Sequence, residues 1–318
     1  MNLNFTNYTQ FGLQNTAAKY TWVSYGTFNI LSSLIGDSII LVASTKYNAF
    51  RLHKTIVAIM QHIAVCDPIS SLNLTLFISS LVAERNILGG FLCYTRAYVT
   101  FYSFPVSFFL TAALTTCKAI LLKFPLQERR WTKRRAHKLC VAIWTCCLLI
   151  PLLLLIVDRD DIRFDYKEYA CYYAFSADVY LFLRPIVGIF TTLLPNAIVI
   201  VTTVWLIMEA RRVAKRGRDS LRWQGLMTVI LTAVVYCISV LPIQLYYIVG
   251  QFIQHDPQGV FHVHFYRFSL AVVCTNVMSN FYIYSLTVSS FRSFLLSRVM
   301  LLKGIISGKG RIRLSQHI

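Results

Sequence analysis

Seven long stretches of this 318-residue chain are almost free of charge, and they limit its fold more than any other feature. Five carry no Asp, Glu, Lys or Arg, and the other two carry one aspartate each, Asp37 and Asp67. About 18 to 20 apolar residues cross the hydrocarbon core of a bilayer as a helix. Backbone polar groups in lipid must pair within their own segment, so each stretch is predicted to be a transmembrane helix. The stretches are residues 20–45, 55–83, 97–117, 139–157, 185–208, 224–254 and 268–291.

The predicted fold is therefore an all-α membrane protein, a bundle of seven transmembrane helices. Residues 1–21 form an extracellular N-terminal segment, 22–288 the membrane domain, and 289–318 an amphipathic helix with a basic cytoplasmic tail. A cleaved signal peptide is the alternative for the first stretch, but residues 1–19 have no basic start and no apolar run. The long stretch 224–254 could hold two segments, although Pro242 within it fits one kinked helix.

The basic residues set the expected orientation, since cytoplasmic loops carry an excess of Lys and Arg. With the N-terminus outside, the inner loops and tail hold 23 of the 31 Lys and Arg residues. The outer segments hold the other eight and balance them with eight acids. The net charge of +18 thus needs no nucleic acid partner and indicates contact with anionic lipid of the inner leaflet, at the plasma membrane.

Two sets of residues belong to the predicted outer side. Cys93 and Cys171 are the only two of the nine cysteines placed there, and disulfides persist on the oxidising side of a membrane, so a bridge is expected. Asn4 and Asn7 each begin a glycosylation acceptor triplet within the first nine residues.

Beyond the seventh stretch, apolar residues recur at helical spacing with basic residues beside them. This pattern predicts an amphipathic helix that lies at the inner membrane surface, and a disordered tail is the alternative. The apolar positions are Phe291, Leu295, Val299 and Leu302.

Taken in order along the chain, these stretches carry one landmark each. Cys93 stands 25 residues before Lys118, and Lys118 stands seven residues before Pro125-Leu126. The remaining landmarks are Gly36-Asp37, Ile63-Ala64-Val65-Cys66-Asp67, Trp144, Pro195, Pro242 and Asn280-Phe281-Tyr282-Ile283-Tyr284.

In this order and spacing the chain resembles the rhodopsin-like (class A) family of G-protein-coupled receptors, as a divergent, orphan-like member. The resemblance implies a receptor that binds an extracellular ligand and acts on a heterotrimeric G protein. It also implies that Lys118, Pro242, Asn280 and Tyr284 lie at the positions that control activation and G-protein contact.

Several departures from the family pattern concern those positions. Cys117-Lys118-Ala119 stands where the family has Asp-Arg-Tyr, and lysine keeps the charge but lacks the planar fork of arginine. Ser239 to Pro242 lack the family's tryptophan, and Phe281 replaces a proline. The contacts that hold the inactive conformation in the family are therefore expected to be weak in this chain. The alternatives that follow are high basal signalling, unconventional coupling to the G protein, or lost coupling.

The intramembrane polar residues are expected to face the bundle interior, because charges at membrane depth are costly. By resemblance, Asp67, Ser107 and Asn280 match the family's pocket for sodium and water. Asp37 adds a second carboxylate, and two nearby carboxylates resist double ionisation. The set Asp37, Asp67, Asn276 and Asn280 is thus a polar network, either with a sodium ion or as a hydrated structural network.

The ligand itself is poorly specified. Aromatic and amide side chains are expected to line its site, namely Tyr98, Phe101, Tyr102, Gln244 and Tyr247, and interhelical packing is the alternative for each. Thr100 replaces the aspartate of amine receptors, and Cys274 replaces the retinal-binding lysine of opsins, which disfavours both classes. No nucleophile or metal constellation indicates an enzyme or a cofactor other than sodium. A membrane transporter remains the alternative function, although no repeated halves or broken helices are evident.

Overall fold

A computed structural model of the protein gives the positions of these residues. It describes residues 16–47, 50, 52–85, 87, 89–124, 131–157, 162–165, 170–173, 186–215, 220–252 and 260–306. The helices among them are α1 (Thr16–Thr45), α2 (Lys54–Ala83), α3 (Gly89–Lys123), α4 (Lys133–Val157), π-helix η4 (Ile189–Leu193), α6 (Leu194–Lys215), α7 (Ser220–Phe252), α8 (Val260–Thr287) and α9 (Ser289–Ile306). Two short strands, β1 (Ile162–Asp165) and β2 (Ala170–Tyr173), lie between α4 and η4.

The seven-helix prediction is confirmed, since each charge-poor stretch lies mainly within one long helix or, for the fifth, within η4 and α6. By length and hydropathy alone, six spans among the described residues could cross a membrane. The seventh helix, α8, does not meet that hydropathy criterion, and it carries Asn276, Asn280 and several tyrosines. The long stretch around Pro242 forms a single helix, α7.

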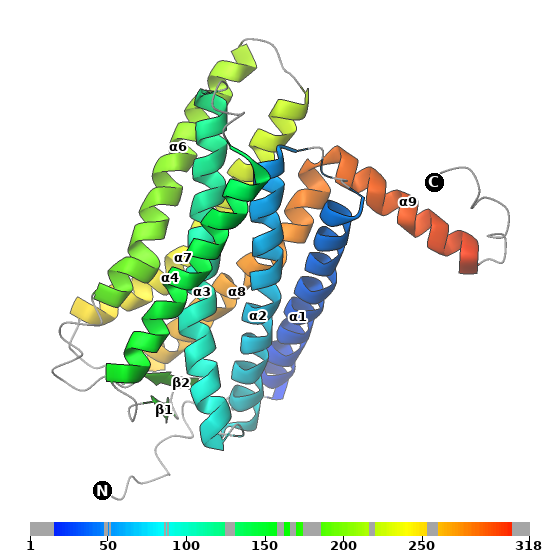
Figure 1. Ribbon diagram of the computed structural model, residues 1–318. Helices are drawn as coiled ribbons and strands as arrows, with labels where there is room; N and C mark the ends of the chain where they lie inside the picture. The colour runs from blue at the N-terminus through cyan, green and yellow to red at the C-terminus, as the bar shows by residue number, and fades with distance from the viewer. Residues whose placement is uncertain are drawn as a thin grey trace, which may run out of the picture.

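The helices form one bundle (Figure 1), in which α2, α3, α6, α7 and α8 each pack on the next and α8 returns to pack against α1. Helix α1 packs on α2, and α4 packs on α2 and α3. Two hydrogen bonds join α1 to the backbone of α8, one from Tyr25 to Ala271 and one of 2.9 Å from Asn29 to Cys274. In an apolar 18-residue segment of α3, 67% of the residues are buried, against 22% in the corresponding segment of Lys133–Leu153, so α3 is central and α4 peripheral.

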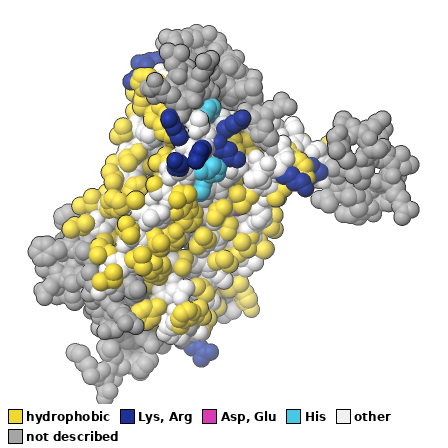
Figure 2. All heavy atoms as spheres, in the orientation of Figure 1, with side chains coloured by type: hydrophobic (Ala, Val, Ile, Leu, Met, Phe, Trp, Pro, Cys, Tyr) yellow, Lys and Arg dark blue, Asp and Glu magenta, His cyan; other side chains and the backbone are white. Residues whose placement is uncertain are grey.

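The two ends of the bundle differ. The β1–β2 hairpin and the start of α3 lie at one end, called here the disulfide end, and α9 projects sideways from the other, the α9 end (Figure 1). Apolar side chains cover much of the face of the bundle between them, as expected for a surface in contact with lipid (Figure 2). Lys and Arg gather near the α9 end in the same view, where Lys133, Arg134 and Lys138 are exposed.

Pro195 explains the irregular start of the fifth helix. A proline inside a helix removes one backbone donor, and its ring clashes with the carbonyl four residues earlier. The π-helical turn η4 lies directly before it, and the hydroxyl of Thr191 donates to the Val187 carbonyl there at 2.7 Å. The wider turn relieves the clash, and such turns are frequent at functional sites.

Helix α9 is held to the bundle by aromatic packing at its start. Phe291 is fully buried and stacks on Phe50, with ring centroids 4.6 Å apart. Farther along, Arg298 lies over the ring of Tyr47 at 4.2 Å. The predicted helix after the seventh span is confirmed, and these contacts fix its direction away from the bundle.

Candidate functional site

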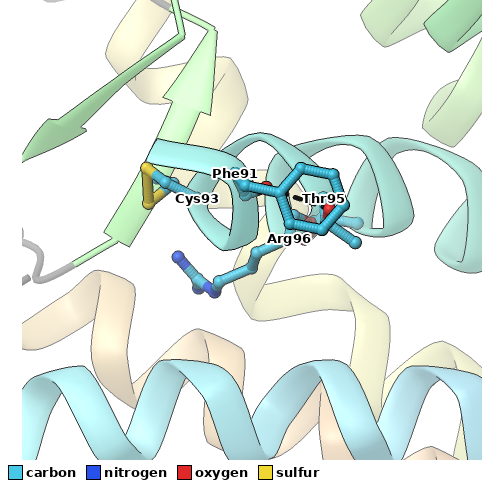
Figure 3. The surroundings of a disulfide bond; sticks show 6 residues. Phe91, Cys93, Thr95 and Arg96 are labelled. Atoms are coloured by element: carbon cyan, nitrogen blue, oxygen red, sulfur yellow. Dashed lines mark hydrogen bonds between the residues drawn. A yellow bond between two sulfur atoms is a disulfide. The ribbon is translucent and has the colours of Figure 1, made fainter. Parts of the chain in front are cut away.

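A disulfide closes one end of the bundle and joins Cys93 of α3 to Cys171 of β2 (Figure 3). Their Cα atoms are 5.4 Å apart. Cys171 lies opposite Phe164 in the antiparallel hairpin, and Phe164 packs against the cluster of Cys93, Ala97 and Cys171. The disulfide thus holds the hairpin over the start of α3. The sequence predicts this bridge from the placement of the two cysteines.

The side chains predicted to line a ligand site occupy different surroundings. Tyr102 contacts Trp144 of α4, with ring centroids 5.7 Å apart. Tyr98 stands one turn earlier on the same face of α3 and lies near Tyr102. Phe101 packs against the disulfide cluster. Gln244 donates to the carbonyl of Thr192 at 3.3 Å and so joins α7 to η4. The side chain of Tyr247 lies outside the described residues, as do Asn4 and Asn7.

Two arginines correct the charge assignment made from sequence. Arg96 and Arg267 count among the outer charges there, but they lie within α3 and α8 and are only 4% and 2% exposed. The uncharged stretches that predict these helices begin one residue later, at 97 and 268, so in the sequence the arginines flank the stretches. Their helices begin seven residues earlier, at Gly89 and Val260, which puts both side chains inside the bundle.

The Arg96 side chain extends from α3 to the side of the view where the disulfide lies (Figure 3). Its guanidinium carbon lies 5.3 Å from the ring centre of Phe77 on α2, and its charge also acts on Cys274 of α8. The turn that carries it is fixed by Thr100, whose hydroxyl donates to the Arg96 carbonyl at 2.8 Å and accepts from Asn73 at 2.7 Å.

Deeper in the bundle, a polar cluster forms around two buried aspartates. Asn280 donates to Asp67 Oδ2 at 2.7 Å, and Ser107 is a further hydrogen-bonding neighbour of the same carboxyl. Ser33, one turn before Asp37 on α1, donates to Asp37 Oδ2 at 2.8 Å. All of these side chains are at most 4% exposed, so the cluster is shielded from bulk solvent.

The two aspartates interact electrostatically, as the sequence predicts for Asp37 and Asp67. Tyr284 lies within range of both carboxyls. Three atoms here, Asp67 Oδ1, Asn280 Oδ1 and the Tyr284 hydroxyl, have no hydrogen-bond partner among the described residues. Asn276, one turn before Asn280 on α8, is also buried.

Close packing of α1 on α8 brings this cluster together. A Cβ atom on Gly36 would lie 2.7 Å from Phe281 Cβ, a distance that real side chains do not adopt. Gly36 directly precedes Asp37, and Phe281 directly follows Asn280. Glycine is therefore required at this helix crossing, where the absence of a Cβ lets the two backbones approach.

Near the α9 end, Lys118 of α3 reaches the start of α7. A Cβ on Gly225 would lie 3.1 Å from Lys118 Nζ and 3.1 Å from Leu52 Cδ2. Tyr284 packs edge-on against Phe50, with ring centroids 5.9 Å apart. Pro242, half-buried in α7, lies far along the helix from Gly225. The predicted activation residues thus lie at several depths and do not form one contact cluster among the described residues.

Sequence reasoning missed the partners that these residues use. Ser33 could have been found, because it stands four residues before Asp37 and so shares its helix face. The short hydrogen bond from Tyr236 to Asn196, which joins α7 to α6, has no such local signal. Gly225 likewise stands in no recognisable motif, because the space that it leaves is used by Lys118 of α3, a helix distant in sequence.

Comparisons with known proteins agree with this architecture. The profile of a family described as 7 transmembrane receptor (rhodopsin family) matches residues 38–284, which is well over half of the chain. The matched part runs from α1 to Tyr284 and includes Asp67 and Lys118, and it begins one residue after Asp37. No curated protein matches the chain.

Proposed function

Since the chain belongs to the rhodopsin family of seven-transmembrane receptors, we propose that it binds an extracellular ligand and signals through a heterotrimeric G protein. The observation that carries the proposal is the family match combined with the position of Lys118. At the place of the family's activation arginine, Lys118 lies against the start of α7 at Gly225. A ligand that favours a packing in which these helices separate would expose this region to a G protein.

The proposed orientation puts the disulfide end outside the cell and α9 at the cytoplasmic surface of the plasma membrane. The bridge needs an oxidising compartment, and the exposed basic residues of α4 suit anionic lipid. Asn4 and Asn7 would then carry glycans. A tag at Ile318 would stay unlabelled on intact cells, and labelling there would reverse the orientation.

The cluster around Asp67 fits a sodium ion. Asp67 Oδ1 and Asn280 Oδ1 are buried oxygens without a hydrogen-bond partner among the described residues, and oxygen is the donor that hard cations prefer. Asp67, Ser107 and Asn280 would hold the ion, which would supply positive charge next to Asp67. The protein's own residues position these oxygens through the close packing of Gly36 on Phe281.

The test is G-protein turnover in membranes that contain the protein, with a panel of G proteins that covers the known classes. Ligand-dependent or basal turnover above that of membranes without the protein supports a signalling receptor. Accumulation of a solute in vesicles would indicate a transporter instead. A ligand that binds without any turnover would indicate a heptahelical protein that has lost coupling, consistent with Cys117-Lys118-Ala119.

A further inference from the structure

Two histidines form a direct contact between α2 and α4, toward the α9 end of the bundle. His62 Nε2 and His137 Nδ1 lie 2.9 Å apart, a hydrogen-bond distance, and the two ring centroids are 5.2 Å apart. Both rings are half-buried, so neither is sealed from the surface. A neutral imidazole has one donor and one acceptor nitrogen, whereas a protonated one has two donors. The bond therefore requires that at least one of the two rings is neutral.

Positive charge surrounds this contact. Lys133 and Arg134 stand one turn before His137 on α4, and both are exposed. Lys138, also exposed, directly follows His137. Figure 2 shows histidine side chains among the Lys and Arg side chains that gather near the α9 end. A charge on His137 also acts on His62. Protons on both rings would thus put two cations at hydrogen-bond distance within an already basic group of side chains.

The other titratable groups on the packed helices leave the proton balance to the two rings. Asp67 stands five residues after His62 on α2, and its carboxyl accepts from Asn280 of α8. Helix α3 packs on both α2 and α4, and its Cys117 acts on Cys140 of α4. Thiols ordinarily titrate at a pH of about 8.5, above the range of histidine. The further described groups of α2 and α3 toward this end are all basic, namely His53, Lys54, Lys118 and Lys123.

Helix α4 has little other support at this end. It packs on α2 and α3, and the buried share of its apolar segment is the smallest among the six described spans. A second hydrogen bond from α2 lies close by, since the hydroxyl of Thr55 donates to the carbonyl of Trp131 at 2.9 Å, two residues before α4 begins. Loss of the histidine bond would leave this bond and apolar packing to hold the start of α4, so the helix should loosen there.

We propose that His62 and His137 form a proton-sensitive contact that fixes α4 to α2 on the α9 side of the membrane. While one ring is neutral, the bond holds the two helices together, and when both rings are protonated their repulsion separates them. Histidine titrates at a pH of about 6.5, so the contact responds within about pH 5–8. Resting on the proposed orientation and receptor function, the compartment that it senses is the cytoplasm, and acidification there would loosen α4 and weaken coupling to the G protein.

The experiment measures the melting temperature of the purified full-length protein across about pH 5–8. In the unfolded chain the two rings are apart, so both take up protons more readily there than in the folded protein. The contact therefore stabilises the fold at the upper end of the range, and this stabilisation is lost as the pH falls. We expect the pair to account for a fall of about 2–4 °C in the melting temperature, which corresponds to one lost hydrogen bond.

Matched variants isolate the pair. His62→Gln and His137→Gln keep a side chain that donates and accepts but does not titrate, so each should lose this part of the pH dependence. His62→Phe removes the bond at every pH and should lower the melting temperature at pH 8 but not at pH 5. His264→Gln removes an exposed histidine of α8 at the disulfide end and should keep the profile of the parent. If His62→Phe does not fold, the Gln variants decide.

Nitrogen NMR of the histidine rings reads the pair in the unaltered protein, with the Gln variants to assign the signals. We expect the signals of His62 and His137 to change together with pH, because a proton on one ring acts on the other.

The proposal is overturned if the parent and both Gln variants share one pH profile, or if His264→Gln removes the dependence equally. It is also overturned if both rings become protonated without a fall in melting temperature. These measurements involve no G protein. A proton-sensitive pair in a protein that never drives turnover would overturn the proposed signalling function and leave this inference standing.

Discussion

Two pairs of like charges are buried in this bundle, and they are stabilised in different ways. Asp37 and Asp67 lie deep between α1, α2 and α8, where Ser33 and Asn280 donate to their oxygens. Arg96, of the second pair, lies beside an aromatic ring, on a helix start that the disulfide holds. The acids thus accept hydrogen bonds within a tight helix crossing, whereas Arg96 packs on an aromatic ring close to the disulfide.

The difference also affects how the charges of the aspartates and of the arginines can change. A pair of carboxylates can lose its repulsion by keeping one proton or by binding a cation. Arginine stays protonated at any accessible pH, so Arg96 and Arg267 keep their positive charge inside the bundle. The bundle therefore holds buried negative and buried positive charge at different depths.

Removing the disulfide between Cys93 and Cys171 should have the largest effect on stability. Cys93→Ser or Cys171→Ser removes a crosslink across 78 residues, and losing a native disulfide costs about 2–5 kcal/mol of stability. We expect lower surface expression, a lower melting temperature and loss of the arginine arrangement, since Cys93 lies only three residues from Arg96.

The matched control is Cys146→Ser, which removes an exposed free cysteine of α4 and should change neither quantity much. Mass spectrometry of protein taken from the cell surface reports the bridge directly. If Cys93 and Cys171 were both free thiols there, the disulfide would not exist in the mature protein.

Moving α1 and α8 apart at Gly36 should disturb the packing around Asp37 and Asp67 and lower the stability of the fold. Gly36→Ala places a methyl group 2.7 Å from Phe281 Cβ, so α1 and α8 must move apart, and overpacking of this kind costs about 1–3 kcal/mol. Gly90→Ala, where a Cβ meets no atom within 4 Å, is the control and should be neutral or slightly stabilising. Equal melting temperatures for Gly36→Ala and the parent would show that the crossing does not depend on the glycine.

Exchanging the acids one at a time should separate their roles. Asp37→Asn removes the repulsion, so Asp67 should ionise more readily and sodium should stabilise the protein more than it does the parent. Asp67→Asn should abolish the sodium effect. The gain is about 1 kcal/mol when sodium is five times its dissociation constant.

The measurement is the melting temperature against sodium at constant ionic strength, with choline as the replacement cation. If the parent and both variants give the same curve, the cluster binds no sodium. A hydrated structural network around Asp67 and Asn280 would then be the better interpretation.

The sequence predicts one of these pairs and not the other, for a physical reason. An aspartate in the middle of an apolar stretch can only be intramembrane, so Asp37 and Asp67 were evident. An arginine at the edge of a stretch looks like a loop charge, and only the true helix start shows that Arg96 is buried. The seven helices, the disulfide and the Ser33 partner of Asp37 could be predicted. The roles of Asn196 and Gly225 could not, because they depend on helices far away in sequence.

The smallest expected effect concerns a third cation, Lys118 near the α9 end. The bundle carries arginines at the disulfide end and a lysine where its family places an arginine. Lys118→Arg would supply the missing fork of donors to a G protein, and one added hydrogen bond is worth about 0.5–1 kcal/mol. We expect basal or ligand-driven turnover to rise roughly two- to fivefold. Lys138→Arg, on an exposed face of α4, is the control. If turnover is unchanged at equal surface expression, Lys118 takes no part in coupling, and the space that Gly225 leaves for it serves packing alone.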